Sequence, residues 1–297
     1  MAAEFRSGFV ALIGRPNVGK STLINRVIGE KVAIVSPKPQ TTRKRILGMV
    51  NTDESQLIFV DTPGVHQAQG ALNKYMVETA FTSAEEADVV AFVVEAEGLK
   101  EGMAIDIGPG NRMVLTRLKT ISKPVVLVIN KIDTIKKVLL LPLIDAYQKE
   151  FPFVEVAPIC ARTGEGVDLL LRLLTEKMPA SPALYPKETF TDQDERTLVG
   201  EYIREQVLRH CRQEIPYSTA VVVEIFDEKE RYTVKLPLPP KGKKAPKPKP
   251  VTEKEATERA LNPRRTGLVK VHAAIFVERD SQKAIVIGRG GARLREV

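Results

Sequence analysis

GRPNVGKS, at residues 14–21, matches the phosphate-binding pattern G-x-x-x-x-G-K-S at every defined position. An apolar run at residues 9–13 precedes it and a helical pattern at residues 20–28 follows it, which is the strand–loop–helix context that this motif requires. In such a loop the backbone N–H groups wrap a β-phosphate, the lysine bridges two phosphates, and the serine hydroxyl binds Mg²⁺. The predicted phosphate-binding residues here are Asn17, Val18, Gly19, Lys20, Ser21 and Thr22.

An alternation of strand-like and helix-like segments extends from this loop through residue 178. Apolar runs predict strands at residues 9–13, 57–61, 89–95, 125–130 and 154–159. Amphipathic runs predict helices at residues 20–28, 71–86, 111–121, 138–151 and 166–177. Nearly continuous Val/Ile runs are typical of strands that are buried on both faces of a parallel sheet. The pattern therefore predicts a doubly wound α/β domain with a mainly parallel sheet.

A second motif, NKID at residues 130–133, indicates which base is bound. It ends the fourth predicted strand, at the edge where open α/β sheets bind ligands. A carboxylate at Asp133 can accept hydrogen bonds from the N1–H and the N2 amino group of guanine. Adenine lacks both donors and would leave the desolvated carboxylate unpaired, which is heavily penalised. We expect Lys131 to lie along the purine, Asn130 to brace neighbouring loops, and guanine to be preferred.

Two further strand ends complete the predicted site. In DTPG, at residues 61–64, Asp61 would hold Mg²⁺ through water and the Gly64 N–H would contact a γ-phosphate. In CARTG, at residues 160–164, the Ala161 N–H would contact guanine O6 beside Cys160. These four motifs in this order predict binding of GTP and GDP with Mg²⁺.

The remaining chain has a different organisation. Three prolines at residues 178–186 indicate a linker, which we place at residues 179–190. A helix at residues 196–212, strands at 218–227 and 268–278, and a helix at 281–287 follow it. Residues 236–266 are rich in proline and lysine, which predicts a disordered insertion between the two strands. The chain then ends in VIGRGGARLREV, where the loop glycines are Gly288, Gly290 and Gly291.

Composition excludes several classes of protein. The longest apolar runs are far shorter than the ~20 residues of a membrane-spanning helix, and residues 1–9 do not resemble a secretory signal. Two cysteines without motif spacing predict free thiols in a cytoplasmic protein. The net charge of +8 suggests an anionic partner. Much of the excess is in one stretch, because residues 238–265 carry nine Lys/Arg against three Glu, or +6, whereas residues 1–180 carry 22 against 20, or +2.

Taken together, the chain resembles the translation-factor-related GTPases and, within them, the Era family. The resemblance is carried by GRPNVGKSTLIN, PKPQTTRKRILG, DTPGVH, VINKID, FTDQDERTLVGEYIREQVL and VERDSQKAIVIGRGG, which span nearly the whole chain. It implies a GTPase domain at residues 1–178 and an α+β KH domain of type II at residues 191–297. The family's KH domain continues beyond the point where this chain stops, so the resemblance implies a C-terminally truncated domain.

The resemblance also implies the conformational switches. Thr42 would complete the Mg²⁺ shell together with Ser21 and Asp61, with Thr41 as the alternative. The residue after DTPG is Val65, which cannot orient water by hydrogen bonding as glutamine does in other GTPases. Related GTPases use K⁺, which Asn17 would help to hold here. The predicted switch residues are Thr41, Thr42, Asp61, Thr62, Pro63, Gly64 and Val65.

For the second domain the resemblance implies recognition of single-stranded RNA, with no DNA partner. A KH domain clamps about four unpaired nucleotides at its GxxG loop. The predicted RNA-binding residues are Ile285, Ile287, Gly288, Arg289, Gly290, Gly291 and Arg293. The family's target is the 3′ end of 16S rRNA, and its role is 30S ribosomal subunit assembly and 16S rRNA processing. Three alternatives stay open: another RNA-modifying or ribosome-assembly GTPase, an RNA-binding module with weak GTPase activity, and a peripheral contact with the inner face of the cell membrane.

Overall fold

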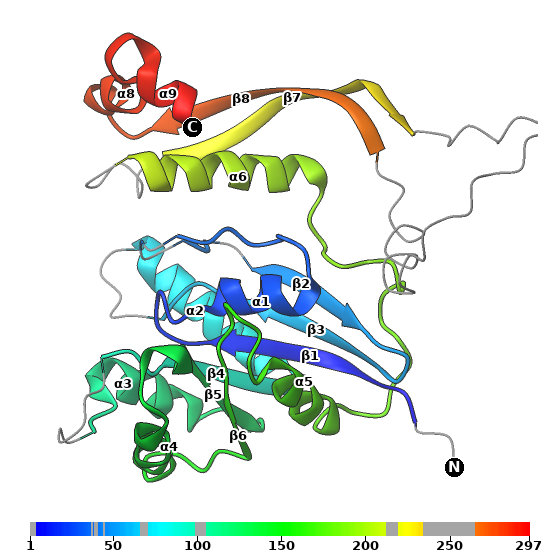
Figure 1. Ribbon diagram of the computed structural model, residues 1–297, viewed down its shortest axis with the longest axis vertical. Helices are drawn as coiled ribbons and strands as arrows, with labels where there is room; N and C mark the ends of the chain where they lie inside the picture. The colour runs from blue at the N-terminus through cyan, green and yellow to red at the C-terminus, as the bar shows by residue number, and fades with distance from the viewer. Residues whose placement is uncertain are drawn as a thin grey trace, which may run out of the picture. The chain divides into compact units, whose positions relative to one another are not determined.

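The computed structural model describes residues 4–36, 38, 41–43, 45–65, 71–98, 105–211, 219–233 and 265–297. The chain divides into two compact units, residues 1–219 with 277–297 and residues 220–276. The first unit contains the α/β domain (Figure 1), whose strands are β1 (Arg6–Ile13), β2 (Ile46–Asn51), β3 (Ser55–Asp61), β4 (Val89–Glu95), β5 (Val125–Asn130) and β6 (Glu155–Pro158). Its helices up to the linker are α1 (Lys20–Ile28), α2 (Ala71–Glu86), α3 (Gly108–Leu118), α4 (Leu140–Gln148) and α5 (Val167–Glu176).

The six strands form one sheet in the order β2-β3-β1-β4-β5-β6. Neighbouring strands from β3 to β6 run parallel, and of these six only β2 is antiparallel to its neighbour, β3. The prediction of a mainly parallel, doubly wound sheet is therefore confirmed. The carboxyl ends of β1, β3, β4 and β5 lie at the same edge, where such sheets bind ligands.

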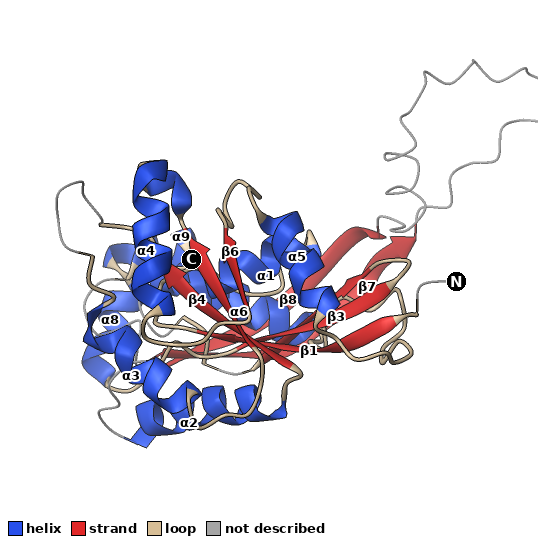
Figure 2. Cartoon of the chain, turned by 90° about the horizontal axis from the view of Figure 1, so that it is seen from below, coloured by secondary structure: helices blue, strands red, loops and turns tan. Residues whose placement is uncertain are grey.

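Both faces of the sheet are buried, as the continuous apolar runs predict. In β1, Val10 and Leu12 belong to the core cluster that α1 and α5 cover, whereas Ala11 and Ile13 belong to the cluster under α2, α3 and α4. Figure 2 shows α2 and α5 on opposite sides of the sheet. The rigid three-layer core positions the loops at its edge.

Strand β2 is the main element that the sequence patterns do not predict. Its six residues follow a basic stretch, and a glycine interrupts their apolar run. The glycine is required by packing, because a Cβ at Gly48 would lie 2.3 Å from Ile28 and 2.9 Å from Ile24 of α1. Two predicted helix starts differ by more than one residue: α3 begins at Gly108 rather than at residue 111, and α4 begins at Leu140, rather than at residue 138, after a short 3-10 turn.

The proline-rich linker is held along the edge of the α/β domain by hydrogen bonds. Gln56 is fully buried, and its side-chain oxygen accepts the N–H groups of Leu184 and Tyr185 at 2.7 and 2.9 Å. Further along, the N–H of Met49 in β2 donates to the Phe190 carbonyl at 3.0 Å. These contacts fasten the predicted linker to β2 and β3.

After the linker come α6 (Glu195–His210), β7 (Thr219–Thr233), β8 (Arg265–Val277), α8 (Asp280–Ile287) and α9 (Ala292–Glu296). This is the predicted order of helix, strand, strand, helix, glycine loop and helix, and β7 and β8 form a two-stranded sheet. The strands are longer than expected, so residues 265–266 of the predicted insertion belong to β8, and residues 236–264 lie outside the described residues. Within the described part of the chain, every helix is too short or too polar to cross a membrane.

Candidate nucleotide-binding site

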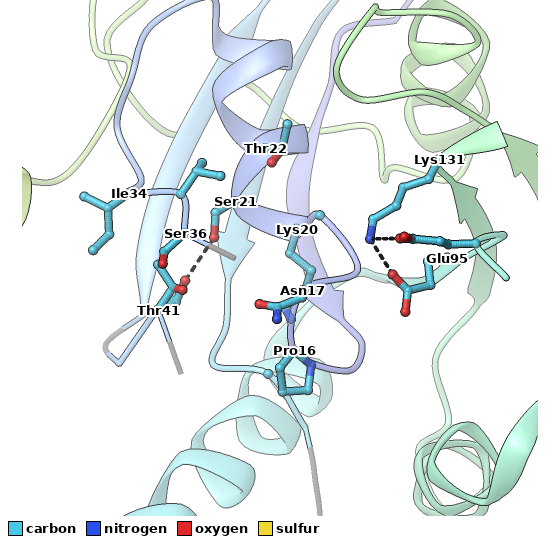
Figure 3. Close-up of a pocket in the computed structure, with 15 residues that line it drawn as sticks. Pro16, Asn17, Lys20, Ser21, Thr22, Ile34, Ser36, Thr41, Glu95 and Lys131 are labelled. Carbon is cyan, nitrogen blue, oxygen red and sulfur yellow. Dashed lines mark hydrogen bonds and ion pairs between the residues drawn. The ribbon is translucent and has the colours of Figure 1, made fainter. Parts of the chain in front are cut away.

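A cavity of about 600 Å³ opens at the ligand-binding edge of the sheet (Figure 3). This volume lies within the range typical of sites for small molecules and cofactors. The lining residues are Pro16, Asn17, Gly19, Lys20, Ser21, Thr22, Ile34, Val35, Ser36, Thr41, Thr42, Gly64, Glu95, Glu97 and Lys131. The structure thus brings most predicted phosphate, metal and switch residues to one place.

The phosphate loop has the backbone that its motif requires. Gly19 has φ +98°, and a Cβ there would lie 2.2 Å from the side-chain amide of Asn130, so only glycine fits. Asn17 also has a positive φ of 65°. The loop leads into the first turn of α1, whose N–H groups and helix dipole favour an anion.

Lys20 is a buried cation at the floor of this loop. Its ammonium group donates to the carbonyls of Gly14 and Arg15 at 3.1 and 3.2 Å, and the residue is 6% exposed. Burial lowers the pKa of Lys20 to about 8, with Asp61 opposing the shift. Among the described residues no carboxylate forms an ion pair with it. A phosphate group of a ligand would compensate this charge.

Three oxygen-bearing side chains meet beside Lys20. The Ser21 hydroxyl donates to Asp61 Oδ2 at 2.7 Å, and the Thr42 hydroxyl lies 3.0 Å from Ser21 Oγ and donates to Asp61 Oδ2 at 3.2 Å. Asp61 is fully buried, and its Oδ1 has no hydrogen-bond partner among the described residues. Burial raises the pKa of this carboxyl, while Lys20 and the two hydroxyls oppose the rise.

This donor set fits Mg²⁺. Mg²⁺ prefers hard oxygen ligands, and in phosphate sites it uses one or two protein carboxylates together with phosphate oxygens. No group of three or more His, Cys, Asp or Glu residues suited to a metal occurs in the described part of the chain. A closed all-protein metal cage is therefore absent there, whereas Asp61 and two hydroxyls leave room for phosphate ligands.

The two candidate threonines of the first switch have different environments. Thr42 is 7% exposed and faces Ser21 and Asp61, whereas the Thr41 hydroxyl turns back to the Lys38 carbonyl at 2.7 Å. The geometry therefore favours Thr42 over Thr41 as the metal ligand.

The DTPG segment lies against the phosphate loop. A Cβ on Gly64 would lie 2.7 Å from the Pro16 backbone, so glycine is needed for this approach. The Thr62 hydroxyl donates to the Leu12 carbonyl at 2.7 Å, and the Val65 N–H donates to the Gly14 carbonyl at 3.0 Å. The Val65 side chain is 1% exposed and packs in the apolar core. It is thus turned away from the cavity, where an attacking water would have to be held.

The guanine-side residues form a connected network. Asn130 donates to the Val18 carbonyl at 2.8 Å and accepts the Ala161 N–H at 2.9 Å, which links the phosphate loop to CARTG as predicted. The Ala161 N–H is thus paired with Asn130, and a contact with guanine O6 would have to share this donor. The sequence does not predict the brace from Arg26 of α1, whose guanidinium donates to the Ala161 carbonyl at 3.1 Å.

Asp133 is held by two side chains. The Cys160 thiol donates to Oδ1 at 3.1 Å, and Arg162 pairs with Oδ2 at 2.7 Å. The Cys160 hydrogen bond, together with Arg162, lowers the pKa of Asp133. Asp133 therefore carries a full negative charge at neutral pH, and guanine would share its two oxygens with Cys160 and Arg162.

Lys131 lines the cavity beside two carboxylates. Its ammonium group forms ion pairs with Glu95 and with Glu97, the latter at 2.8 Å (Figure 3). Burial would lower its pKa, but the two carboxylates outweigh burial and raise it. No sequence motif singles out Glu95 and Glu97, although Glu95 ends a strand at the ligand edge, which is a usable signal.

The predicted RNA-binding loop connects α8 to α9. Gly288, Gly290 and Gly291 have positive φ values of 74°, 60° and 77°. Ile285 and Ile287 are 40% and 44% exposed, and Arg289 is exposed. Arg293, which is predicted to face RNA, donates one hydrogen bond to the Ile285 carbonyl at 2.7 Å. The loop thus exposes backbone, two aliphatic side chains and one cation.

Comparison with protein families identifies two regions. Residues 9–131 match the family described as 50S ribosome-binding GTPase, and residues 252–297 match the KH domain family. Proteins named GTPase Era from Geobacter metallireducens and Lacticaseibacillus paracasei are 44% and 41% identical over 296 and 295 residues. The aligned regions cover 99% of this chain and 85% and 84% of those proteins.

Solved structures agree with these relatives. A crystal structure of Era in complex with MgGDPNP and nucleotides 1506–1542 of 16S ribosomal RNA superposes with a TM-score of 0.79 at 36% identity, covering 98% of this chain and 85% of that one. A crystal structure of a single-residue variant of Aquifex aeolicus Era, bound to GDP and AlF4⁻, gives a TM-score of 0.78 at 34% identity, covering 98% and 86%. Both similarities extend over nearly the whole chain.

Proposed function

This chain belongs to the Era family of GTPases, and we propose that it couples GTP hydrolysis in the Lys20 cavity to rRNA binding through its KH domain. Hydrolysis of GTP to GDP and phosphate is the family's reaction. We place its action in small ribosomal subunit assembly, on the 3′ end of 16S rRNA and the 30S subunit. The related Era structure contains a 16S rRNA fragment together with a magnesium GTP analogue, which supports this target.

One observation carries the proposal. A buried cation and a cluster of side-chain oxygens lie at one pocket, and this pocket is linked to the carboxylate that would bind guanine. Lys20 and the Ser21–Thr42–Asp61 cluster lie at the phosphate end. Asn130 ties this end to the loop that holds Asp133. Release of phosphate from GTP, measured with and without an RNA matching the 3′ end of small-subunit rRNA, tests the proposal; an absence of turnover under both conditions would overturn it.

The roles of the residues follow from their positions. The N–H groups of residues 17–22 would bind the phosphates, and Lys20 would offset the charge that spreads over them in the transition state. Ser21, Thr42 and Asp61 would hold Mg²⁺, which neutralises phosphate charge when bound. Asp133 would select guanine, with Asn130, Lys131, Cys160 and Ala161 around it. The switch residues 41–42 and 61–65 would respond to the γ-phosphate.

Turnover is expected to be faster in K⁺ than in Na⁺ buffer. Val65 is buried and cannot orient a water molecule, so added positive charge near the phosphates is needed from another source. Asn17 lines the cavity and is the residue that would help to hold K⁺. Steady-state rates in matched chloride salts check this expectation, and equal rates would contradict it.

Reversing the charge of Arg289 is expected to weaken RNA binding by roughly tenfold near 0.1 M salt and to lower the salt dependence of binding. Arg289 is exposed within the glycine loop, where RNA phosphates would approach. Fluorescence anisotropy of Arg289→Glu with a labelled single strand, measured over a salt series, gives both quantities. Lys283→Glu on α8 is the matched control, because Lys283 is exposed but pairs with Asp280 at 3.3 Å. Equal effects of the two substitutions would exclude a specific role for the loop.

The domain limits that we propose are residues 1–178 for the GTPase domain, 179–190 for the linker and 191–297 for the KH domain of type II. We propose a cytoplasmic location, where ribosomal subunits are assembled. A peripheral membrane contact stays a prediction, and co-sedimentation with anionic lipid vesicles at physiological salt checks it.

A further inference from the structure

The described residues between 31 and 42, namely 31–36, 38, 41 and 42, have two different neighbours. Toward the cavity, Ile34, Val35, Ser36, Thr41 and Thr42 line the nucleotide pocket. Helix α6 contacts the same segment, since the Tyr202 hydroxyl donates to the Lys31 carbonyl and the Lys38 ammonium group donates to the Cys211 carbonyl. The pocket wall that contains the first switch is therefore shared with α6, although Tyr202 follows Lys31 by 171 positions in the chain.

Glu205 anchors the middle of this contact. Its side chain is fully buried, and Oε1 accepts the Val35 N–H at 3.0 Å while the carboxylate pairs with Lys31. Arg209 adds a second ion pair at 3.1 Å. Burial would raise the pKa of Glu205, but the hydrogen bonds from Lys31 and the Val35 N–H outweigh burial and lower it. A buried charge of this kind is stable only while these partners stay in place.

Arg204 makes the contact nearest to the predicted metal ligands. Its Nη2 donates to the Thr41 carbonyl at 2.5 Å, and the residue is 3% exposed. Glu201 on the same helix fixes the guanidinium, accepting from Nε at 2.8 Å and from Nη2 at 2.5 Å. The peptide that follows the Thr41 carbonyl is planar and leads directly to Thr42. Arg204 therefore sets the orientation of the peptide that carries the Thr42 hydroxyl toward Ser21 and Asp61.

We propose that Arg204 is a positioning residue for GTP hydrolysis, which holds Thr42 at the metal site from α6. The inference rests on the proposed function and goes beyond it, because it makes the GTP site incomplete without α6. Arg204 does not line the nucleotide pocket and acts only through Thr41. By linkage, a nucleotide that favours this placement of Thr42 also strengthens the contact of Thr41 with α6.

The proposal predicts different effects on the two nucleotide states. Thr42 would act only when a γ-phosphate is bound, whereas GDP relies on the phosphate loop and the guanine residues. Loss of Arg204 should therefore weaken binding of a GTP analogue and slow turnover, while binding of GDP is preserved. A purely structural role would weaken both nucleotides together.

The test compares Arg204→Met and Arg204→Lys with Arg196→Met, which removes an exposed arginine near the start of the same helix. For Arg204→Met we expect kcat and the affinity for a non-hydrolysable GTP analogue to fall roughly tenfold, the effect of one charge-assisted hydrogen bond. The affinity for GDP should stay within about twofold. Arg204→Lys should recover part of the loss, since lysine still donates to the Thr41 carbonyl.

Hydrogen exchange in the nucleotide-free protein supplies a readout that does not depend on turnover. Exchange of the Thr42 amide should accelerate in Arg204→Met but not in Arg196→Met, because the Thr41 carbonyl of the same peptide loses its donor on α6. Equal behaviour of these two variants, or equal losses of GDP and analogue affinity, would overturn the proposal. If the unmodified protein showed no turnover, the proposed function would fail, and the affinity ratio and exchange data would still decide the role of Arg204.

Discussion

Replacing Lys20 with methionine is expected to slow GTP hydrolysis by about a thousandfold, as when a main transition-state charge contact is removed. Lys20 lies at the floor of the phosphate loop and forms no ion pair within the described residues. Methionine has a similar length, so the loop can keep its shape while the charge is lost. Single-turnover phosphate release at saturating enzyme measures the effect, and a rate within tenfold of the unmodified protein would contradict the assigned role.

The pH dependence of folding stability shows whether Lys20→Met removes the titration of this buried ammonium group. Burial lowers the pKa of Lys20 to about 8 from 10.5. Between these values the unfolded chain binds a proton that the folded protein does not, so stability of the nucleotide-free protein rises as pH rises. The full gain in the free energy of unfolding is roughly 3 kcal/mol, and this gain is absent below pH 8. Denaturant unfolding should show this rise in the unmodified protein, and it should be missing in Lys20→Met.

The nucleotide site is predictable because its chemistry is local in sequence. Gly19 must be glycine for its backbone angle and for the approach of Asn130, and Lys20 follows it directly. The spacing of the motif thus encodes a loop shape and a charge in eight residues. Thr42 follows less directly, and the structure favours it over Thr41 because only Thr42 reaches Ser21 and Asp61.

The α6 contact could not be predicted in the same way. Charged side chains such as those of Arg204 and Glu205 are almost always exposed unless they are paired, yet both residues are buried here. Their partners Thr41 and Val35 lie 163 and 170 positions earlier in the chain, and no periodicity connects such distant residues. Strand β2 is not predicted from the sequence for a related reason. It is stabilised by pairing with β3 and with the linker rather than by its own short apolar run.

Cys160 has a role that the sequence alone does not decide, because the motif does not show whether a thiol can brace the guanine loop. In the structure the thiol donates to Asp133 Oδ1 at 3.1 Å, which is within the longer range of sulfur hydrogen bonds. A weak donor therefore braces the Asp133 carboxylate.

Replacing Asp133 with asparagine is expected to weaken GTP and GDP binding by about 10²–10³-fold. The carboxylate offers guanine two acceptors, one for N1–H and one for the N2 amino group. Asparagine keeps one acceptor and turns an amide donor toward the amino donor. Fluorescence titration with a labelled GDP measures the loss. Asp145→Asn on α4 is the control, since Asp145 also pairs with a cation at 2.6 Å but lies outside the NKID and CARTG motifs.

The same substitution should move specificity toward xanthine nucleotides. Xanthine keeps the N1–H donor of guanine and has a carbonyl acceptor where guanine has its amino group, so it matches the acceptor and donor of asparagine. Hydrolysis of XTP by Asp133→Asn should therefore exceed its hydrolysis of GTP, the reverse of the order in the unmodified protein. Because the substitution leaves Lys20 and the Ser21–Thr42–Asp61 cluster intact, the recovered rate would assign Asp133 to base recognition alone. Equal loss of both nucleotides would instead mean that Asp133 maintains the loop through Cys160 and Arg162.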